Sequence, residues 1–213
     1  MLIRAVIVVA LAPFVLSILY TIVPPVSTLM LARWATLRPV ERDWMPLDKI
    51  SPALPRAVIG SEDAKFCSHR GVDWGELRAV INDEDGPSRG ASTISMQVVK
   101  NLFLWQGFGY VRKPVEVVLA HWLDFIWPKR RMMEVYLNTA EWGPNGVFGA
   151  EAISRKAFGK SALQLTPREA AILAAALPNP VVRNSAKPTR SQIRRAGTIN
   201  ARAAQADSSC VSR

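Results

Sequence analysis

Apolar residues occur as one long run at the start of the chain and as periodic segments after it. The run covers residues 5–23 and contains no charged residue. A bilayer core of ~30 Å needs about 20 helical residues, so the run predicts one N-terminal transmembrane helix, which Pro24 and Pro25 end. A cleaved signal peptide is the alternative, but its apolar core usually spans only ~7–15 residues before a small-residue cleavage site. We therefore expect residues 1–32 to be a membrane anchor.

The rest of the chain repeats its apolar residues at helical spacing rather than in alternation. Residues 33–50 are mixed in character and interrupted by proline, which predicts a linker. Residues 51–181 are predicted to form helices separated by loops rich in Gly, Pro and Asn. Within them, Thr166 and Glu169 form a capping-box pattern with Pro at the first helical position. Because no stretch alternates in the manner of a strand, we expect an all-α fold.

The clearest helical pattern lies in residues 92–103. Its spacing gives two apolar stripes with a polar stripe between them. The apolar stripes are Ile94, Val98 and Leu102, and Met96, Val99 and Phe103; the polar stripe is Thr93, Gln97, Lys100 and Asn101. Apolar residues on both sides leave little room for solvent, so we expect the polar stripe to bind a ligand rather than to form a solvated face.

The chain carries a formal net charge of +10, and most of it lies at the C-terminal end. Residues 182–213 contain seven Lys or Arg residues and a single acidic residue, Asp207. A solvated helix or a disordered end is the simplest interpretation of this basic tail, and binding to nucleic acid or to an anionic membrane are the alternatives. Hydrophobic residues make up 49% of the chain, which excludes a wholly disordered protein.

Cysteine and histidine are scarce. The two cysteines, Cys67 and Cys210, exclude a disulfide-dense scaffold, and the sequence alone leaves open whether they pair. No C-x-x-C or H-E-x-x-H motif is present to hold zinc. Two histidines leave little scope for catalysis or metal binding built on His. Carboxyl and cationic side chains are therefore the candidates for chemistry.

Two adjacent carboxyl groups, Glu62 and Asp63, follow an apolar helical segment. At the mouth of a cleft, burial would raise the pKa of Glu62 and make it a useful general base. A solvated helix end is the alternative interpretation of this residue taken alone. His69 follows closely, and a structural hydrogen bond is the simplest role for it.

A loop that enters a helix places further candidates between Gly90 and Asn101. Ser92 lies where the backbone N–H groups of a helix start are free, and such a site suits phosphate. Gln97, Lys100 and Asn101 are spaced i, i+3 and i+4, so they project together. A cation, an amide and helix-start donors on one stripe suit an anionic, sugar-bearing ligand.

Arg112, Lys113 and Glu116 form another group of candidates. Arg112 and Glu116 stand one helical turn apart, a spacing that is also typical of an ordinary i,i+4 ion pair. Glu116 shares its stripe with apolar residues, so we expect it to face partly inward. A half-buried carboxylate beside two cations is a candidate second site group.

In this order and spacing, these groups resemble the glycosyltransferase family 51 domain of peptidoglycan polymerases. The family pattern E-D-x-x-F-x-x-H-x-G is present at residues 62–71, and G-x-S-T-I-x-x-Q-x-x-K-N at residues 90–101. R-K-x-x-E follows at residues 112–116, and K-x-x-x-x-x-x-Y-L-N at residues 129–138, whose Met, Tyr and Leu are most simply core. The expected anchor, with no following S-x-x-K penicillin-binding motif, indicates the monofunctional biosynthetic branch of the family.

Two residues depart from the family pattern. Met96 stands where the family usually has a first glutamine before Gln97, so one amide is missing. Phe108 stands where members often carry an arginine that contacts phosphate. The second departure puts one cation of the donor site in doubt, although Lys100, Arg112 and Lys113 remain.

The resemblance implies a lysozyme-like fold, with a helical lobe and a smaller, membrane-dipping jaw around a cleft. It implies that lipid-linked disaccharide-peptide (lipid II) is polymerised into glycan strands during cell wall synthesis, with inversion and with release of polyprenyl pyrophosphate. Glu62 is then the general base. Glu116 is a second catalytic group that orients the cations or helps at the leaving group, in the latter case through a divalent ion, Mg²⁺ or Mn²⁺. The substrate-binding residues are Asp63, Ser92, Gln97, Lys100, Asn101, Arg112 and Lys113. No cofactor is required by this expectation, and no metal site is certain.

Two other functions fit part of the pattern. A lysozyme-like peptidoglycan hydrolase or lytic transglycosylase is the main alternative, because glycosidases also use two carboxyl groups. The cationic stripe discriminates between them, since an enzyme that cleaves neutral glycosidic bonds has no use for phosphate-binding cations. A membrane-anchored basic scaffold without catalysis would not need Glu62, Lys100 and Glu116 in this arrangement.

Local charge and substrate chemistry favour opposite orientations of the body. Arg33, Arg38 and Arg42 follow the expected span and, counted alone, would keep the body in the cytoplasm. The implied substrate is polymerised on the outer face of the cytoplasmic membrane, so we expect a single-pass inner-membrane protein with a periplasmic catalytic domain. The expected partners are the lipid-linked precursor, the glycan strand, the membrane and other cell-wall synthesis or division proteins, and no nucleic acid.

Overall fold

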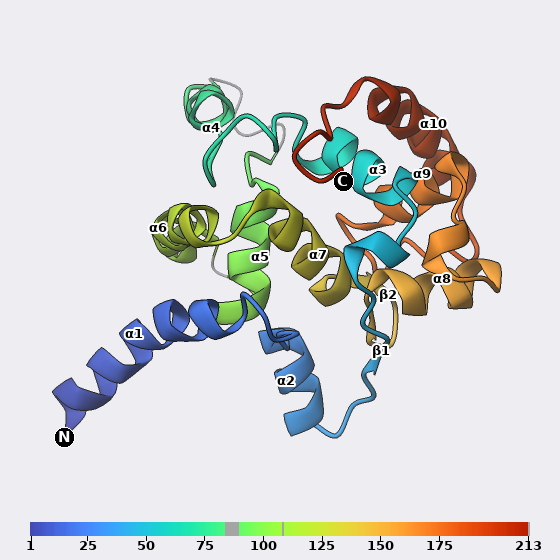
Figure 1. The fold of residues 1–213 in the computed structure, drawn as a ribbon. Coiled ribbons are helices and arrows are strands. Elements are labelled where there is room, and N and C mark those ends of the chain that lie inside the picture. Colours follow the sequence, from blue (N-terminus) through green and yellow to red (C-terminus); the bar gives the residue numbers. More distant parts are fainter. Residues whose placement is uncertain (84–89, 108, 213) are drawn as a thin grey trace.

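A computed structural model describes residues 1–83, 90–107 and 109–212, which form a mainly helical body from which the N-terminal helix projects (Figure 1). The α-helices in residues 1–139 are α1 (Leu2–Leu19), α2 (Thr28–Ala35), α3 (Ala53–Glu62), α4 (Trp74–Ile81), α5 (Ile94–Phe103), α6 (Gly109–Ile126) and α7 (Lys129–Thr139). The later helices are α8 (Ala150–Phe158), α9 (Pro167–Ala176) and α10 (Arg190–Gln205). Two 3-10 turns, η1 (Leu47–Lys49) and η2 (Ala162–Gln164), complete the helical elements of the described residues.

A small three-stranded sheet corrects the expectation of an all-α fold. Its strands are β1 (Glu41–Arg42), β2 (Glu141–Gly143) and β3 (Val147–Phe148), in the order β1-β3-β2. β3 runs parallel to β1 and antiparallel to β2. Strands of two or three residues are too short to show the alternation by which a strand is recognised, so the sequence pattern missed them.

The expected transmembrane helix is also wrong. Helix α1 has 18 residues, ends at Leu19 rather than at Val23, and includes Arg4 in its first turn. At ~1.5 Å per residue it is about 27 Å long, short of a ~30 Å hydrocarbon core. Among the helices that the structure describes, none combines the length and the apolar character that crossing a membrane requires.

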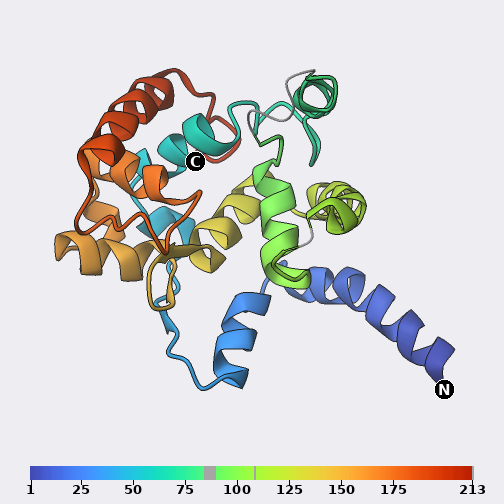
Figure 2. The ribbon, with the colours of Figure 1, turned by 180° about the vertical axis from the view of Figure 1, so that it is seen from behind.

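The C-terminal end of α1 is bound to the body instead. The Ser17 side chain is fully buried. Its hydroxyl accepts a hydrogen bond from Trp122 Nε1 (2.8 Å), and its carbonyl accepts one from Trp127 Nε1 (2.9 Å). Arg131 of α7 donates to the carbonyl of Tyr20 (2.9 Å), just after the helix. These contacts hold one end of α1 against α6 and α7, while the other end points away from the body in both views (Figures 1 and 2).

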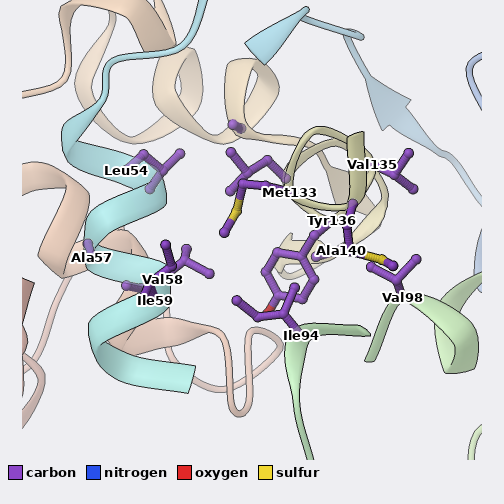
Figure 3. Packing of buried hydrophobic residues seen from close by; sticks show 14 of the residues in the cluster. Leu54, Ala57, Val58, Ile59, Ile94, Val98, Met133, Val135, Tyr136 and Ala140 are labelled. Atoms are coloured by element: carbon purple, nitrogen blue, oxygen red, sulfur yellow. The ribbon is translucent and has the colours of Figure 1, made fainter. Parts of the chain in front are cut away.

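One layer of the hydrophobic core lies between α3, α5 and α7, next to the helix ends that form the cleft described below. Figure 3 shows α3 facing α7, with the start of α5 below them. The residues labelled there are Leu54, Ala57, Val58 and Ile59 of α3, Ile94 and Val98 of α5, and Met133, Val135, Tyr136 and Ala140 of α7 and its end; all are at most 4% exposed. Burying a large aliphatic side chain contributes about 1.5–3 kcal/mol, so this layer supplies much of the stability.

The predicted stripes of residues 92–103 are confirmed by burial. Ile94, Met96, Val98, Val99 and Leu102 are at most 5% exposed, whereas Phe103 is only partly buried. The capping box at Thr166 and Glu169 is likewise confirmed at the start of α9. Local periodicity and capping chemistry therefore predicted these helices correctly.

The basic C-terminal segment folds as α10, which packs against α3 and α9 (Figure 1). Gly60 of α3 permits this approach, because a Cβ atom there would lie 3.0 Å from the backbone nitrogen of Ala203. A disulfide between Cys67 and Cys210 ties the chain after α10 to the segment after α3. Packing and a covalent bond together hold α10 beside the end of α3.

We predict that replacing Cys67 and Cys210 by serine lowers the free energy of unfolding by about 2–5 kcal/mol. The bond joins residues 143 positions apart, and without it the unfolded chain gains the entropy of an open loop. Urea unfolding measures the loss. Reductant should destabilise the unaltered protein by the same amount and leave the serine variant unchanged; a variant as stable as the oxidised protein would contradict the prediction.

Candidate active site

A cleft of about 800 Å³ opens between the end of α3, the start of α5 and helix α10. Residues 60–65 form one part of its wall and residues 90–93 another. Side chains at the cleft include Glu62, Gln97 and Lys100, and α10 contributes Arg195 and Arg202. Asp63, Asp73, Glu76 and Lys65 also line the cleft, and Lys65 forms ion pairs with Asp73 and Glu76. Several carboxyl groups and several cations therefore share a single depression of the surface.

Glu62, the last residue of α3, is a partly buried carboxyl group of the cleft. Burial raises the pKa of Glu62 above its ordinary value. A hydrogen bond from Gln97 Nε2 to Glu62 Oε2 (3.1 Å) and the charges of Arg195 and Lys100 lower that pKa in part. A carboxyl group balanced in this way is suited to exchange a proton with a bound molecule.

Asp63, the next residue, has a different environment. Its side chain is 4% exposed, and both carboxylate oxygens lie 2.9 Å from the Nε2 atom of His69, which donates to them. Asp63 Oδ2 also accepts a hydrogen bond from the backbone N–H of Ile94 (2.9 Å). Asp63 therefore joins the end of α3 to the start of α5. His69 makes the structural hydrogen bond that the sequence favoured for it.

Helix α5 and the residues just before it bring three of the predicted residues to the cleft: Ser92, Gln97 and Lys100. Thr93 caps the helix, accepting from the N–H of Met96 and donating to the carbonyl of Gly71 (2.6 Å). Asn101 is not among the residues described as lining the cleft. Its carbonyl accepts a hydrogen bond from the Thr28 hydroxyl (3.2 Å), so it contacts α2.

Lys100 is a cation in an unfavourable electrostatic setting. Burial lowers its pKa, and the neighbouring charges of Arg112 and Lys113 lower it further. Glu116 and Glu62 oppose this effect in part. A bound anion would relieve the repulsion, so the site favours a negatively charged ligand beside Lys100.

Arg112, Lys113 and Glu116 form a compact ionic group on α6. Glu116 is 2% exposed and contacts both cations: Arg112 Nε at Oε1, and Lys113 Nζ at Oε2 (3.1 Å). Lys113 Nζ also donates to the Ser92 hydroxyl (2.6 Å), which lines the cleft. Through Ser92 this group reaches the same depression as Glu62 and Lys100. Phe108, one of the two departures from the family pattern, lies outside the described residues.

The donor set around Glu116 does not fit a divalent cation. Both carboxylate oxygens already contact positively charged groups, which would repel a second cation. Among residues 1–83, 90–107 and 109–212, no group of three or more His, Cys, Asp or Glu side chains is arranged to hold a metal ion. The arrangement neutralises Glu116 with the protein's own cations.

Two cleft residues, Arg195 and Arg202, were missed as individual candidates. Both are exposed on α10, seven positions and thus about two helical turns apart, so they share a face. Their spacing was a signal in the sequence, but nothing there indicated that this face would meet Glu62. Packing of α10 on α3 brings them to the cleft.

The arrangement combines a proton acceptor with groups that hold negative charge. Glu62 has a raised pKa and faces the cleft, and Lys100 and the two α10 arginines bring positive charge to its lining. Lys113 lies behind the lining and reaches it by donating to Ser92. Such a site can remove a proton from a hydroxyl and stabilise an anionic leaving group. It suits a transfer reaction with an anionic donor.

Comparison with known proteins gives a consistent result. The sequence model of the transglycosylase family matches residues 30–204. A biosynthetic peptidoglycan transglycosylase of Rhodopseudomonas palustris (strain TIE-1) is 56% identical over 211 residues, covering 96% of this chain and 89% of the relative. Proteins of the same name from Nitrobacter winogradskyi (55% identical; 92% and 88% covered) and Brucella suis biovar 1 (50% identical; 94% and 91% covered) are also similar.

We predict that the Glu62→Gln variant becomes more stable than the unaltered protein as the pH rises above 4.5, the ordinary pKa of a glutamate carboxyl group. A raised pKa means that the folded state binds the proton more tightly than the unfolded chain. The stabilising contribution of Glu62 is therefore complete below pH 4.5 and is lost as the pH rises through its folded pKa. Urea unfolding at pH 4 and pH 7 compares the variant with the unaltered protein.

Glu169→Gln is the matched control with the opposite sign. Burial of Glu169 is outweighed by hydrogen bonds from Lys160 and Thr166, so its pKa is lowered. Its stabilising contribution is present above pH 4.5 and is lost as the pH falls through the folded pKa. Glu169→Gln should therefore lose stability at pH 7, and the same sign in both variants would contradict the electrostatic description of the cleft.

Proposed function

Because the chain belongs to the transglycosylase family and is a peptidoglycan glycosyltransferase of bacterial cell wall synthesis, we propose that it polymerises lipid-linked disaccharide-peptide units with Glu62 as its general base. The observation that carries the proposal is the partly buried Glu62 carboxyl, which faces a cleft that Lys100, Arg195 and Arg202 also line. Burial makes this group a better proton acceptor than a solvated glutamate near neutral pH.

In the proposed reaction, Glu62 accepts the proton of an acceptor sugar hydroxyl. The hydroxyl oxygen forms a bond with the anomeric carbon of the growing glycan, from the face opposite the leaving group. The bond between that carbon and the pyrophosphate oxygen breaks, and its electron pair leaves with the polyprenyl pyrophosphate. The glycan grows by one unit with inversion at the anomeric carbon, and Glu62 returns its proton to solvent.

Cations around the cleft stabilise the leaving pyrophosphate in this proposal. Lys100 is the cation with an unfavourable environment, which a bound anion relieves. Lys113 donates to Ser92 at the cleft, and Glu116 holds Lys113 and Arg112 in place. Positive groups that are fixed before the reaction stabilise developing charge without a cost of reorganisation. Because Glu116 does not fit a divalent cation, no step runs through a metal.

The remaining predicted site residues take different parts. Gln97 donates to Glu62 and so orients the base. Asp63 acts through the helix junction it makes with His69 and Ile94. Contact of Asn101 with substrate stays a prediction.

As a cell wall enzyme, the protein works in the cell envelope, and we place its body on the outer face of the cytoplasmic membrane. The disulfide supports an oxidising compartment. Arg33 donates to the carbonyl of Pro39, and Arg42 to that of Pro25, so these flanking cations are part of the fold and weigh less as an orientation signal. Association with other cell-wall synthesis or division proteins stays a prediction.

Contact with the membrane surface follows from the lipid-linked substrate. Helix α6 exposes a row of apolar side chains at intervals of three, four or seven residues. They are Val111, Val115, Val118 and Phe125. The outer face of α1 is also apolar and exposed, with Val9 at 73% and Val15 at 65%. Both surfaces suit an environment of lipid headgroups and acyl chains.

We predict that Glu62→Gln lowers the polymerisation rate by about 10²–10⁴-fold, the usual contribution of a general base, while the protein stays folded. Purified protein incubated with labelled lipid-linked disaccharide-peptide gives the rate. A variant that polymerises at the native rate would overturn the assignment of Glu62. Shortening of pre-made glycan without new strands would instead indicate the hydrolase alternative.

We also predict a bell-shaped pH profile for polymerisation. The rate rises as Glu62 loses its proton and falls as Lys100, whose pKa is lowered by burial, loses its charge. Lys100→Arg should move the alkaline limb to higher pH, because arginine stays protonated. An unchanged alkaline limb in this variant would show that Lys100 does not titrate in the reaction.

A further inference from the structure

A chain of two hydrogen bonds links the core to the proposed base. Tyr136 of α7 is 1% exposed, and its hydroxyl lies 3.1 Å from Gln97 Oε1. The amide nitrogen of the same Gln97 side chain lies 3.1 Å from Glu62 Oε2. Figure 3 shows the Tyr136 ring reaching from α7 towards the start of α5, beside Ile94. Three helices therefore meet through a phenol, an amide and a carboxyl group.

The phenol has a fixed role as donor. Burial raises the pKa of Tyr136 well above its ordinary value, and the charges of Glu62 and Asp63 raise it further. The hydroxyl therefore keeps its proton at any pH at which the protein works. Within the described residues, Gln97 Oε1 is the acceptor for that proton. The surrounding core is apolar, so an alternative acceptor would have to be introduced at a cost in packing.

An amide side chain can present either its oxygen or its nitrogen to a neighbour. If the Gln97 amide were reversed, its oxygen would face Glu62, an arrangement that suits only the protonated carboxyl group. The buried phenol proton would then have no acceptor, which carries the penalty of an unsatisfied buried donor. Donation by Tyr136 therefore selects the orientation in which Gln97 donates to Glu62.

We propose that Tyr136 is a positioning residue, which acts through Gln97 to keep a hydrogen-bond donor on Glu62 and so maintains Glu62 as the proton-accepting carboxylate. The proposal rests on the function proposed for Glu62. Tyr136 is buried and is not among the described residues that line the cleft, so it acts through another residue; the sequence pattern alone assigned it to the core. Its hydroxyl, rather than its ring, carries the role.

The test is Tyr136→Phe, which keeps the ring and removes the hydroxyl. Without the phenol donor the reversed amide is no longer penalised, so the protonated form of Glu62 gains stability. The acidic limb of the polymerisation profile should move to higher pH, with a loss of about three- to tenfold on that limb, the effect of one hydrogen bond. The rate should recover on the alkaline side of the limb, and KM should stay unchanged.

Tyr20→Phe is the matched control. Tyr20 follows α1, and its ring stacks on Phe103. In the hydrogen bonds described for it with another side chain, its backbone carbonyl accepts from Arg131. Loss of this hydroxyl should leave the acidic limb in place. A residue that only fills the core would lower the melting temperature or reduce the rate equally at every pH, and either result for Tyr136→Phe, without a shift of the limb, would overturn the proposal.

A double-mutant cycle gives a second, independent test of whether Tyr136 acts through Gln97. Gln97→Ala should itself move the acidic limb to higher pH, because it removes the donor to Glu62. If Tyr136 acts through Gln97, adding Tyr136→Phe to this variant should produce no further shift. If Tyr136→Phe shifted the acidic limb equally with and without Gln97→Ala, the action of Tyr136 through Gln97 would be overturned.

Failure of this inference can be told apart from failure of the proposed function. If Glu62→Gln is inactive but the pH profile of Tyr136→Phe is not shifted, only the role proposed for Tyr136 is overturned. A Glu62→Gln variant with the native polymerisation rate overturns the base, and with it both proposals.

Discussion

The buried carboxylate of Asp63 joins the end of α3 to the start of α5, and the geometry of the cleft depends on this junction. Asp63 accepts hydrogen bonds from His69 and from the backbone of Ile94, so neither oxygen is left without a partner. Removing one partner of such a buried group costs far more than the bond contributes. The junction fixes the direction in which the preceding residue, Glu62, leaves its helix, and it brings Gln97 within reach of that residue.

Around this junction the protein accepts unfavourable electrostatics. Glu62 is half-buried, and Lys100 lies among other cations, so burial disfavours the charged form of each. The layer between α3, α5 and α7 and the disulfide at Cys67 offset this cost elsewhere in the fold. Stability given up at a functional site and recovered in the core is the usual exchange between activity and stability.

Helix α10 changes the meaning of the basic C-terminal segment. Helix α10 packs on α3 at Gly60, and the disulfide between Cys67 and Cys210 holds the chain after it in place. The helix therefore forms a wall of the cleft, with Arg195 and Arg202 beside Glu62. The net positive charge of the chain therefore belongs in part to the site. This placement agrees with the proposed pyrophosphate-bearing substrate, whose developing charge fixed cations would stabilise.

The sequence by itself determined the helices of residues 92–103 and 167–176, the capping of the latter, and the residue types that form the cleft, because each depends on spacing within one helix. It overestimated α1 as a span, because the helix ends at Leu19, two residues after Ser17 docks on Trp122 and Trp127. It missed strands of two or three residues, which have no period to detect. Only the tertiary structure decided three further features: the disulfide, the place of the α10 arginines at the cleft, and the link from Tyr136 to Glu62. Each joins residues far apart in the chain, and periodicity carries no information about which distant faces will meet.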